Sequence, residues 1–315
     1  MRVYPEWFLG AGFFCFGLIF GSFLNVCIYR LPRGLSVVAP RSACPNCHTP
    51  IAAHDNIPVL SWLILRGRCR HCHVPITPRY AAVELVCGLL FLFSFLQAGY
   101  SIEALKGCVL CFLLLGLTFT DAETHLLPDA MTLPGLAVAI LFSLFSLVPG
   151  PAYRLFPPHF HGALTLLQVN LQLGWRSLVN SLLGAAIGSG VLYGIAQVYL
   201  KLRKTEGMGL GDVKLMAMAG AFLGPILTLF VLCSASLLGG AYGVFILLAV
   251  FRKRIARYRV RFGLQASSRA WQAAQTAMQC MEIPFGVFLS IMSIVAWFYG
   301  MQIIRGYLNL FRIFA

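Results

Sequence analysis

Long runs of apolar residues recur along the whole of this 315-residue chain. A run of about 18 or more such residues is long enough to cross roughly 30 Å of hydrocarbon as a helix. With 59% hydrophobic and 11% charged residues, the sequence predicts an all-α membrane protein, a polytopic bundle of about eight transmembrane helices. Only Gly224 and Pro225 interrupt the sixth and seventh runs. The predicted spans are residues 7–29, 80–98, 103–120, 130–149, 177–200, 213–230, 231–251 and 283–305.

The polar stretches between the runs divide the chain. Residues 1–29 are expected to be a retained first transmembrane helix, because Arg2 alone supplies a basic start and no small-residue cleavage site follows. Residues 30–79 form the only sizeable polar region, a small loop domain. Residues 80–315 form a transmembrane domain with insertions at about 150–176 on the outer side and 252–282 on the cytoplasmic side.

The basic residues favour one side of the membrane. The net charge is +14, and 18 of the 24 Lys and Arg residues lie in residues 30–79, 201–214 and 252–269. With eight spans these segments share one side, which the positive-inside rule identifies as the cytoplasm. The 252–282 insertion fits either an amphipathic helix on anionic lipid or a loop that fixes the topology. This distribution of basic residues argues against nucleic-acid binding and indicates that the lipid bilayer is a partner.

Four cysteines in the loop domain have the spacing of a metal site. Cys44 and Cys47, and then Cys69 and Cys72, form two CxxC pairs with 21 residues between them. Four thiolates spaced in this way can surround Zn²⁺ tetrahedrally, and a reducing cytoplasm disfavours disulfides. Metal binding would also supply folding energy to a domain with little core. Redox chemistry and unligated cysteines remain alternatives, and His48, His71 and His73 are neighbouring ligands that could substitute.

Two aspartates lie at the ends of apolar runs, in a chain with ten acidic residues. Asp121 ends the third run and Asp212 begins the sixth, so the predicted topology places both at the cytoplasmic face. A carboxylate near lipid is costly and marks a functional site by default. Two carboxylates that share a proton can activate water. Asp212 has an alternative role as the N-cap of a helix that begins at Val213.

Other residues near these aspartates have more ordinary readings. Asp129 is expected to cap the fourth span, Glu123 and Glu206 to be solvated, and Glu84 to be a buried structural partner, for instance of an arginine. The glycines at 207, 209 and 211 allow the backbone to bend and a peptide to approach Asp212. Their spacing is not that of a dinucleotide-binding motif.

The motifs together resemble the type IV prepilin peptidases, which are membrane aspartyl proteases of the GxGD class. The resemblance extends over nearly the whole chain and rests on several stretches. These are GSFLNVCIYRLPRG (21–34), NIPVLSWLILRGRCRHC (56–72) with the paired CxxC loop, RYAAVEL (79–85), DAETHLLPD (121–129), EGMGLGDVKL (206–215) and IPFGVFLS (283–290). Glu123 stands where the family often has a second aspartate.

The resemblance implies a function for these residues. Asp121 and Asp212 would be catalytic, and residues 80–315 would form the peptidase domain. The substrates would be prepilins or pseudopilins, whose short basic leaders are removed at the cytoplasmic face of a bacterial inner membrane. Many family members then methylate the new N-terminus with S-adenosylmethionine, and the four-cysteine loop accompanies such bifunctional members. No motif locates the S-adenosylmethionine pocket, so its cofactor-binding residues are unknown.

Local physics suggests how the aspartates divide the work. Asp212, at a helix N-terminus and near Lys214, is expected to stay ionised and act as the general base toward water. Asp121, at a helix C-terminus, is expected to donate a proton to the leaving amine. A methyltransferase without proteolysis, and a transporter or sensor that uses the aspartates for ion coupling, remain the competing functions. A transporter would be expected to show repeated halves, and none is evident.

Overall fold

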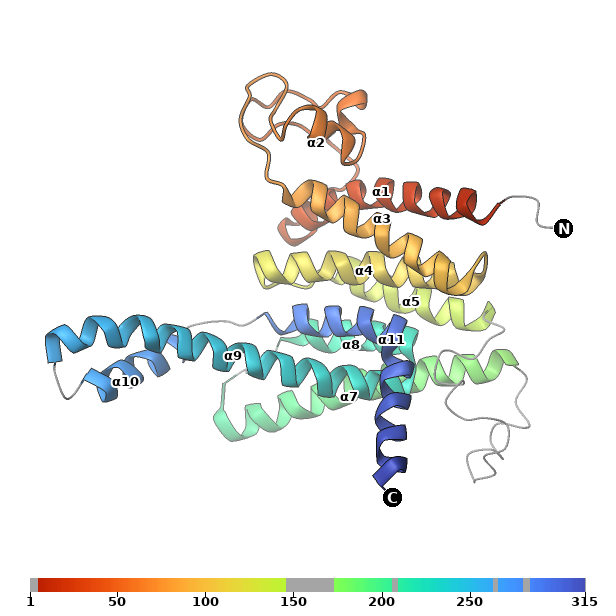
Figure 1. The fold of residues 1–315 in the computed structure, drawn as a ribbon. Helices are drawn as coiled ribbons and strands as arrows, with labels where there is room; N and C mark the ends of the chain where they lie inside the picture. Colours follow the sequence, from red (N-terminus) through yellow and green to blue (C-terminus); the bar gives the residue numbers. More distant parts are fainter. Residues whose placement is uncertain (1–4, 146–172, 206–208, 263–265, 280–283, 315) are drawn as a thin grey trace.

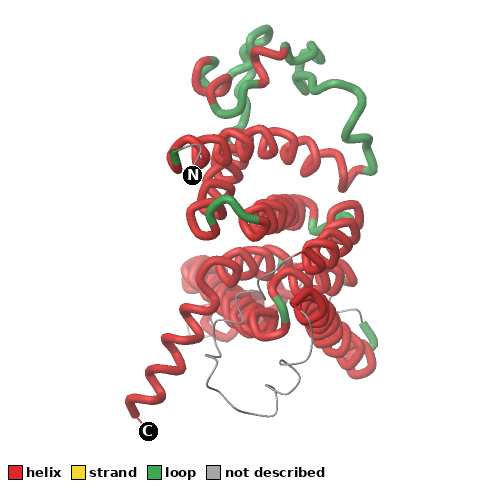
Figure 2. Tube along the Cα trace, turned by 90° about the vertical axis from the view of Figure 1, so that its right-hand side faces the viewer, coloured by secondary structure: helices red, strands yellow, loops and turns green. Residues whose placement is uncertain are grey.

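A computed structural model describes residues 5–145, 173–205, 209–262, 266–279 and 284–314. Within these ranges the chain is helical, with loops and two isolated bridges but no strand, as Figures 1 and 2 show. The all-α prediction is therefore confirmed for the described residues. The long or apolar helices are α1 (Glu6–Arg30), α3 (Arg79–Ala98), α4 (Ile102–Thr124), α5 (Asp129–Phe145), α7 (Leu173–Arg203), α8 (Leu210–Leu223), α9 (Pro225–Phe262) and α11 (Phe285–Phe314).

Six of these helices are long and apolar enough to cross a membrane: α1, α3, α4, α7, α9 and α11. The other two are shorter, with 17 residues in α5 and 14 in α8. The predicted boundary between two spans at residues 230 and 231 is wrong. The break falls at Gly224, which has a positive φ of 78°, and Pro225 begins α9. Proline suits the first turn of a helix, where its missing N–H needs no partner.

Glycines bring the helices of the bundle close together. A Cβ on Gly17 of α1 would lie 2.7 Å from the Cα of Gly88 on α3, and one on Gly21 would lie 2.7 Å from the Cα of Glu84. Small residues four apart are typical of close helix pairs in membranes. In α7, a Cβ on Gly184 would lie 2.1 Å from the carbonyl oxygen of Gly220 in α8, so these two helices are also in close contact. The contact between α7 and α8 fixes the position of α8, whose first turn carries the second predicted aspartate, Asp212.

The middle of α8 lies inside the bundle. It packs against α4, α5, α7, α9 and α11, and Leu215, Met216 and Met218 have no exposed surface. A helix surrounded in this way is held in position by its apolar side chains. Its N-terminal turn therefore has a defined place relative to the last turn of α4.

Residues 31–78 connect α1 to α3 and project from the bundle beside these two helices (Figures 1 and 2). They contain the short elements η1 (Leu31–Arg33), η2 (Ala53–Asn56) and α2 (Leu60–Ile64). The backbone N–H of Val59 donates to Oε2 of Glu84, at 2.8 Å. Val59 has φ 60°, which is strained for a β-branched residue. Glu84 is thus a structural partner as expected, but of a backbone amide rather than an arginine.

The basic segment after residue 251 continues α9 to Phe262, and α10 (Ala266–Gln279) folds back against α9 (Figure 1). The rings of Phe251 and Trp271 pack edge to face, with centroids 5.6 Å apart. The expected lipid-facing helix in this insertion stays a prediction. The outer insertion at about 150–176 lies almost wholly outside the described residues.

Candidate active site and metal centre

Three helix ends meet at the predicted aspartates. Asp121 lies in the last turn of α4, which ends where His125 takes a left-handed conformation, and Asp212 lies in the first turn of α8. Gly286, in the first turn of α11, lies between them. A Cβ built on Gly286 would lie 2.8 Å from Oδ2 of Asp121 and 3.1 Å from Oδ1 of Asp212. Both carboxylates therefore approach one point, despite their separation in the sequence.

The environments of the two carboxylates differ. The backbone N–H of Val287 donates to Oδ2 of Asp121, at 2.9 Å. Asp121 is 6% exposed, whereas Asp212 is half-buried. The N-terminus of a helix favours a negative charge, because its N–H groups are unpaired and its dipole is positive there. Asp212 also lies in the first turn of a helix, α8, so it is the hydrogen bond from Val287 that favours the shared charge on Asp121.

Lys214 does not contact Asp212. Its Nζ lies 2.7 Å from Oδ1 and 2.8 Å from Oδ2 of Asp129, the first residue of α5. This ion pair links α8 to α5 at the end of the bundle that carries the aspartates. The expectation that Lys214 keeps Asp212 ionised is therefore not supported by the geometry.

Asp212 is not the N-cap of its helix. The helix begins at Leu210 with Gly209 as the N-cap, so Asp212 lies inside the first turn and its N–H donates to the Gly209 carbonyl, at 3.3 Å. The capping alternative fails because the helix starts three residues before Val213. A Cβ on Gly211 would lie 3.0 Å from the Cβ of Leu127. The small size of Gly211 thus lets the loop after α4 approach α8. Gly207 and Glu206 lie outside the described residues.

Glu123 was expected to be a solvated acid. In the structure it forms an ion pair with Nη1 of Arg79. Arg79 is the first residue of α3, and its guanidinium lies over the ring of Tyr80, 4.8 Å from the centroid. Residues 121 and 123 are two apart, so their side chains leave α4 about 200° apart. Asp121 therefore faces α8 and α11, whereas Glu123 faces α3.

The four predicted metal ligands form one cluster. Their sulfurs all lie within 4.8 Å of one another, with Cys44 and Cys72 at 3.7 Å and Cys47 and Cys69 at 4.0 Å. Tetrahedral zinc, with Zn–S bonds of about 2.3 Å, separates its sulfurs by about 3.8 Å. A disulfide would need about 2.05 Å. The cluster therefore fits a four-thiolate zinc ion and excludes disulfides among these cysteines.

The two CxxC pairs have the same backbone structure. In each pair, the carbonyl of the first cysteine accepts the N–H of the histidine that follows the second cysteine, from His48 to Cys44 at 2.9 Å and from His73 to Cys69 at 3.1 Å. Both histidines have positive φ, 55° and 56°. Their geometry makes them turn residues, so the cluster needs no histidine ligand. An isolated bridge closes each turn, Ala43–Pro50 and Arg68–Pro75.

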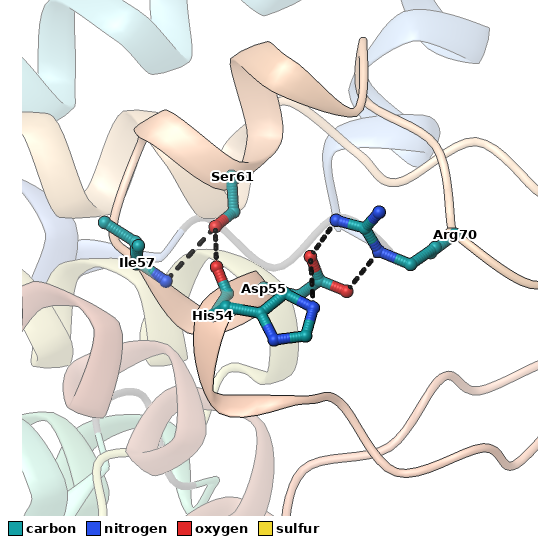
Figure 3. A network of polar contacts seen from close by, with 5 residues as sticks. All are labelled: His54, Asp55, Ile57, Ser61 and Arg70. Atoms are coloured by element: carbon teal, nitrogen blue, oxygen red, sulfur yellow. Dashed lines mark hydrogen bonds and ion pairs between the residues drawn. The ribbon is translucent and has the colours of Figure 1, made fainter.

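Polar contacts hold the segment between the two pairs (Figure 3). Arg70 donates to Asp55 through Nε at 2.7 Å and Nη2 at 2.5 Å. The Arg70 guanidinium holds the pKa of the Asp55 carboxyl below its usual range. Ser61 donates to the carbonyl of His54 and accepts the N–H of Ile57, each at 3.2 Å (Figure 3). Arg70, two residues before Cys72, is thereby tied to η2.

Sequence reasoning missed Gly286 and Val287 as site residues. Both lie in the IPFGVFLS motif, which indicated the family but gave no role to either residue. The signal that could have identified them is Pro284, which is followed at once by a helix, as expected for a helix start. Their contact with Asp121 crosses 166 residues of sequence and needs the folded bundle to be seen.

Comparison with known proteins agrees with these features. Residues 15–98 match the family described as Bacterial Peptidase A24 N-terminal domain, and residues 108–244 match the Type IV leader peptidase family. No solved structure matches the chain.

The relatives compared below carry the name Prepilin leader peptidase/N-methyltransferase. The Aeromonas hydrophila protein is 33% identical over 97% of this chain and 96% of its own length. The Neisseria gonorrhoeae protein is 35% identical over 81% of this chain and 86% of its own. The Myxococcus xanthus protein is 40% identical over 76% of this chain, which spans 63% of that relative. With similarity over almost all of its length to such relatives, and with both family regions in order along it, the chain belongs to the type IV leader peptidase family.

Proposed function

We propose that this chain is a membrane aspartyl endopeptidase that removes the short basic leader from type IV prepilins or pseudopilins. We also propose that it methylates the new N-terminal residue. One observation carries the peptidase proposal: two carboxylates approach a single point at Gly286, where the ends of three apolar helices meet. The family membership and the names of the relatives support the same activity.

The proposed roles of the two acids reverse those expected from the sequence. Asp121 accepts the N–H of Val287 at the N-terminus of α11 and is the ionised member. It accepts a proton from the attacking water. Asp212 has no contact with Lys214 and faces the charge of Asp121, so it holds the shared proton and donates it to the leaving amine. Because the pair titrates as a unit, these roles describe one protonation state.

Zinc is the proposed structural metal of the loop domain. Cys44, Cys47, Cys69 and Cys72 would hold it as thiolates, and the sulfur separations fit tetrahedral coordination. Four protein ligands leave no open position, so the ion would stabilise the fold and take no part in hydrolysis. S-adenosylmethionine is the proposed methyl donor, which supplies an electrophilic methyl group when bound.

The proposed location is the bacterial inner membrane, with the active site at its cytoplasmic face. The proposed domains are a first transmembrane helix (1–29), a zinc-binding loop domain (30–79) and a transmembrane peptidase domain (80–315). The 252–282 insertion would lie on the cytoplasmic side and the 150–176 insertion on the outer side. The clustering of basic residues in three segments supports this orientation.

Mass spectrometry of a prepilin co-expressed with this protein tests both reactions together. We expect loss of the leader and a methyl increment on the new N-terminus. Asp121→Asn and Asp212→Asn should each abolish leader loss and leave the zinc content unchanged. Asp129→Asn is the matched control, an acid at the same end of the bundle that contacts neither aspartate of the pair. Full cleavage by either dyad variant refutes the peptidase assignment.

A further inference from the structure

Arg79 has one edge of its guanidinium without a partner. Its Nη1 donates to Glu123, but Nε and Nη2 are shielded from solvent and have no hydrogen-bond partner. Its ring contact with Tyr80 engages the face of the guanidinium and leaves these N–H groups unsatisfied. A buried donor without an acceptor costs free energy, so such a group calls for an explanation.

The free edge is one that can bind both oxygens of a carboxylate. Elsewhere in the protein, Arg70 uses the same two atoms, Nε and Nη2, to hold both oxygens of Asp55 (Figure 3). Two parallel charge-assisted hydrogen bonds of this kind recognise a carboxylate specifically. The Glu123 contact, made through Nη1, leaves the two donors of this edge of Arg79 without an acceptor.

A second unsatisfied atom belongs to the same region. Asn25 of α1 is 5% exposed, and its Nδ2 donates to the backbone carbonyl of Tyr80, at 3.0 Å. Its Oδ1 is buried and has no partner. The residue next to Arg79 thus anchors an amide whose acceptor oxygen is free. Carboxylate-binding donors and a free acceptor together suit a ligand with a carboxylate and an N–H group, as an α-amino acid has.

We propose that the Nε and Nη2 edge of Arg79 binds a carboxylate beside Asn25, on the side of α4 opposite the Asp121–Asp212 pair. The inference rests on the proposed function, which supplies two sources of this chemistry. One is the amino-acid end of S-adenosylmethionine, whose ammonium group would donate to Oδ1 of Asn25. The other is an acidic side chain of the prepilin. In either case the site lies across one helix from the dyad, because Glu123 and Asp121 leave α4 in opposite directions.

Ligand binding tests the proposal without reliance on activity. S-adenosylmethionine and its decarboxylated analogue are titrated by calorimetry into the purified, zinc-loaded protein. A prepilin peptide that spans the cleavage site is titrated in parallel, with its acidic side chains intact or replaced by amides. Wild type is compared with Arg79→Lys, which keeps the charge and loses the two-pronged edge. Arg33→Lys is the matched control, because Arg33 also lies over a tyrosine, Tyr29, but has no buried unpaired nitrogen.

If S-adenosylmethionine is the ligand, wild type should bind its decarboxylated analogue roughly ten- to hundredfold more weakly than S-adenosylmethionine itself. Arg79→Lys should lose that preference, and Arg33→Lys should keep it. If the prepilin is the ligand, the same pattern should follow the acidic side chains of the peptide instead. Equal affinities of wild type for both members of both ligand pairs overturn the proposal, even if Arg79→Lys fails to fold.

The failure of the proposed function would look different. A wild-type protein that neither shortens nor methylates a prepilin contradicts that function. A wild-type protein that does both, but binds the ligands without regard to their carboxylates, contradicts only the role of Arg79.

Discussion

Val287 donates its backbone N–H to the carboxylate of Asp121, and this bond joins the first turn of α11 to the last turn of α4. It distinguishes Asp121 from Asp212, which also lies in the first turn of a helix, α8. A hydrogen bond donated to a carboxylate stabilises its anionic form, so this bond favours the charge on Asp121. The residue before Val287, Gly286, leaves room for the second acid to approach the same point.

Gly286→Ala should therefore impair catalysis far more than folding. The new methyl group would lie within about 3 Å of both carboxylates and push them apart. A misplacement of about 1 Å can cost roughly a hundredfold in rate, so we expect kcat to fall by about that factor with a smaller change in KM. Steady-state cleavage of a prepilin peptide measures both constants. Gly306→Ala, on the same helix with open space around it, should behave as wild type.

Lys214→Met tests whether Asp121 or Asp212 is the ionised member of the pair. Lys214 pairs with Asp129, and both side chains are partly exposed, so the loss should cost about 0–1 kcal/mol of stability. The pH–rate profile should keep its shape, because Lys214 does not contact the dyad. A profile displaced by a pH unit or more would indicate that Lys214 sets the ionisation of Asp212, as the sequence alone suggested.

Removal of zinc should loosen the loop domain and leave the helical bundle folded. Cys44→Ser breaks the four-thiolate set, so we expect less than one bound zinc per chain and rapid proteolysis within residues 31–78. Elemental analysis and limited proteolysis measure these effects. Cys15→Ser, an exposed cysteine of α1, is the control and should retain a full zinc ion. Normal zinc content in the Cys44 variant would contradict the assignment of the ligands.

Glu84→Gln should weaken the attachment of the loop domain to α3. The carboxylate accepts the N–H of Val59, and a neutral amide is the weaker acceptor by roughly 1 kcal/mol. Hydrogen exchange near Val59 should therefore become faster, while zinc remains bound. Unchanged exchange at residues 57–61 would show that other contacts fix this segment.

The sequence predicted the features that depend on local composition. Apolar runs gave the helices, because length and hydropathy alone decide whether a segment suits lipid. The spacing of the cysteines gave the metal cluster, because the ligands of each pair lie within one turn. The predicted break between two helices was placed at residue 230 instead of Gly224. The apolar composition does not change at Gly224, where the helix ends because the backbone takes a positive φ.

Contacts between distant segments were beyond such reasoning. Lys214 and Asp129 are 85 residues apart in the sequence. Because Lys214 pairs with Asp129, it does not keep Asp212 ionised, contrary to what the sequence alone suggested. Glu123 looked like a solvated acid because nothing nearby in the sequence pairs with it, whereas Arg79 reaches it from another helix. Composition places charges at a membrane face, but only packing decides which of them meet.

The length of α8 has a consequence for the depth of its ends in a membrane. Its 14 residues rise about 21 Å, roughly 9 Å less than the hydrocarbon of an ordinary bilayer. The two ends of this helix therefore cannot both reach the headgroups of an ordinary bilayer, so at least one of them, the Asp212 end or the Gly224 end, lies below the membrane surface.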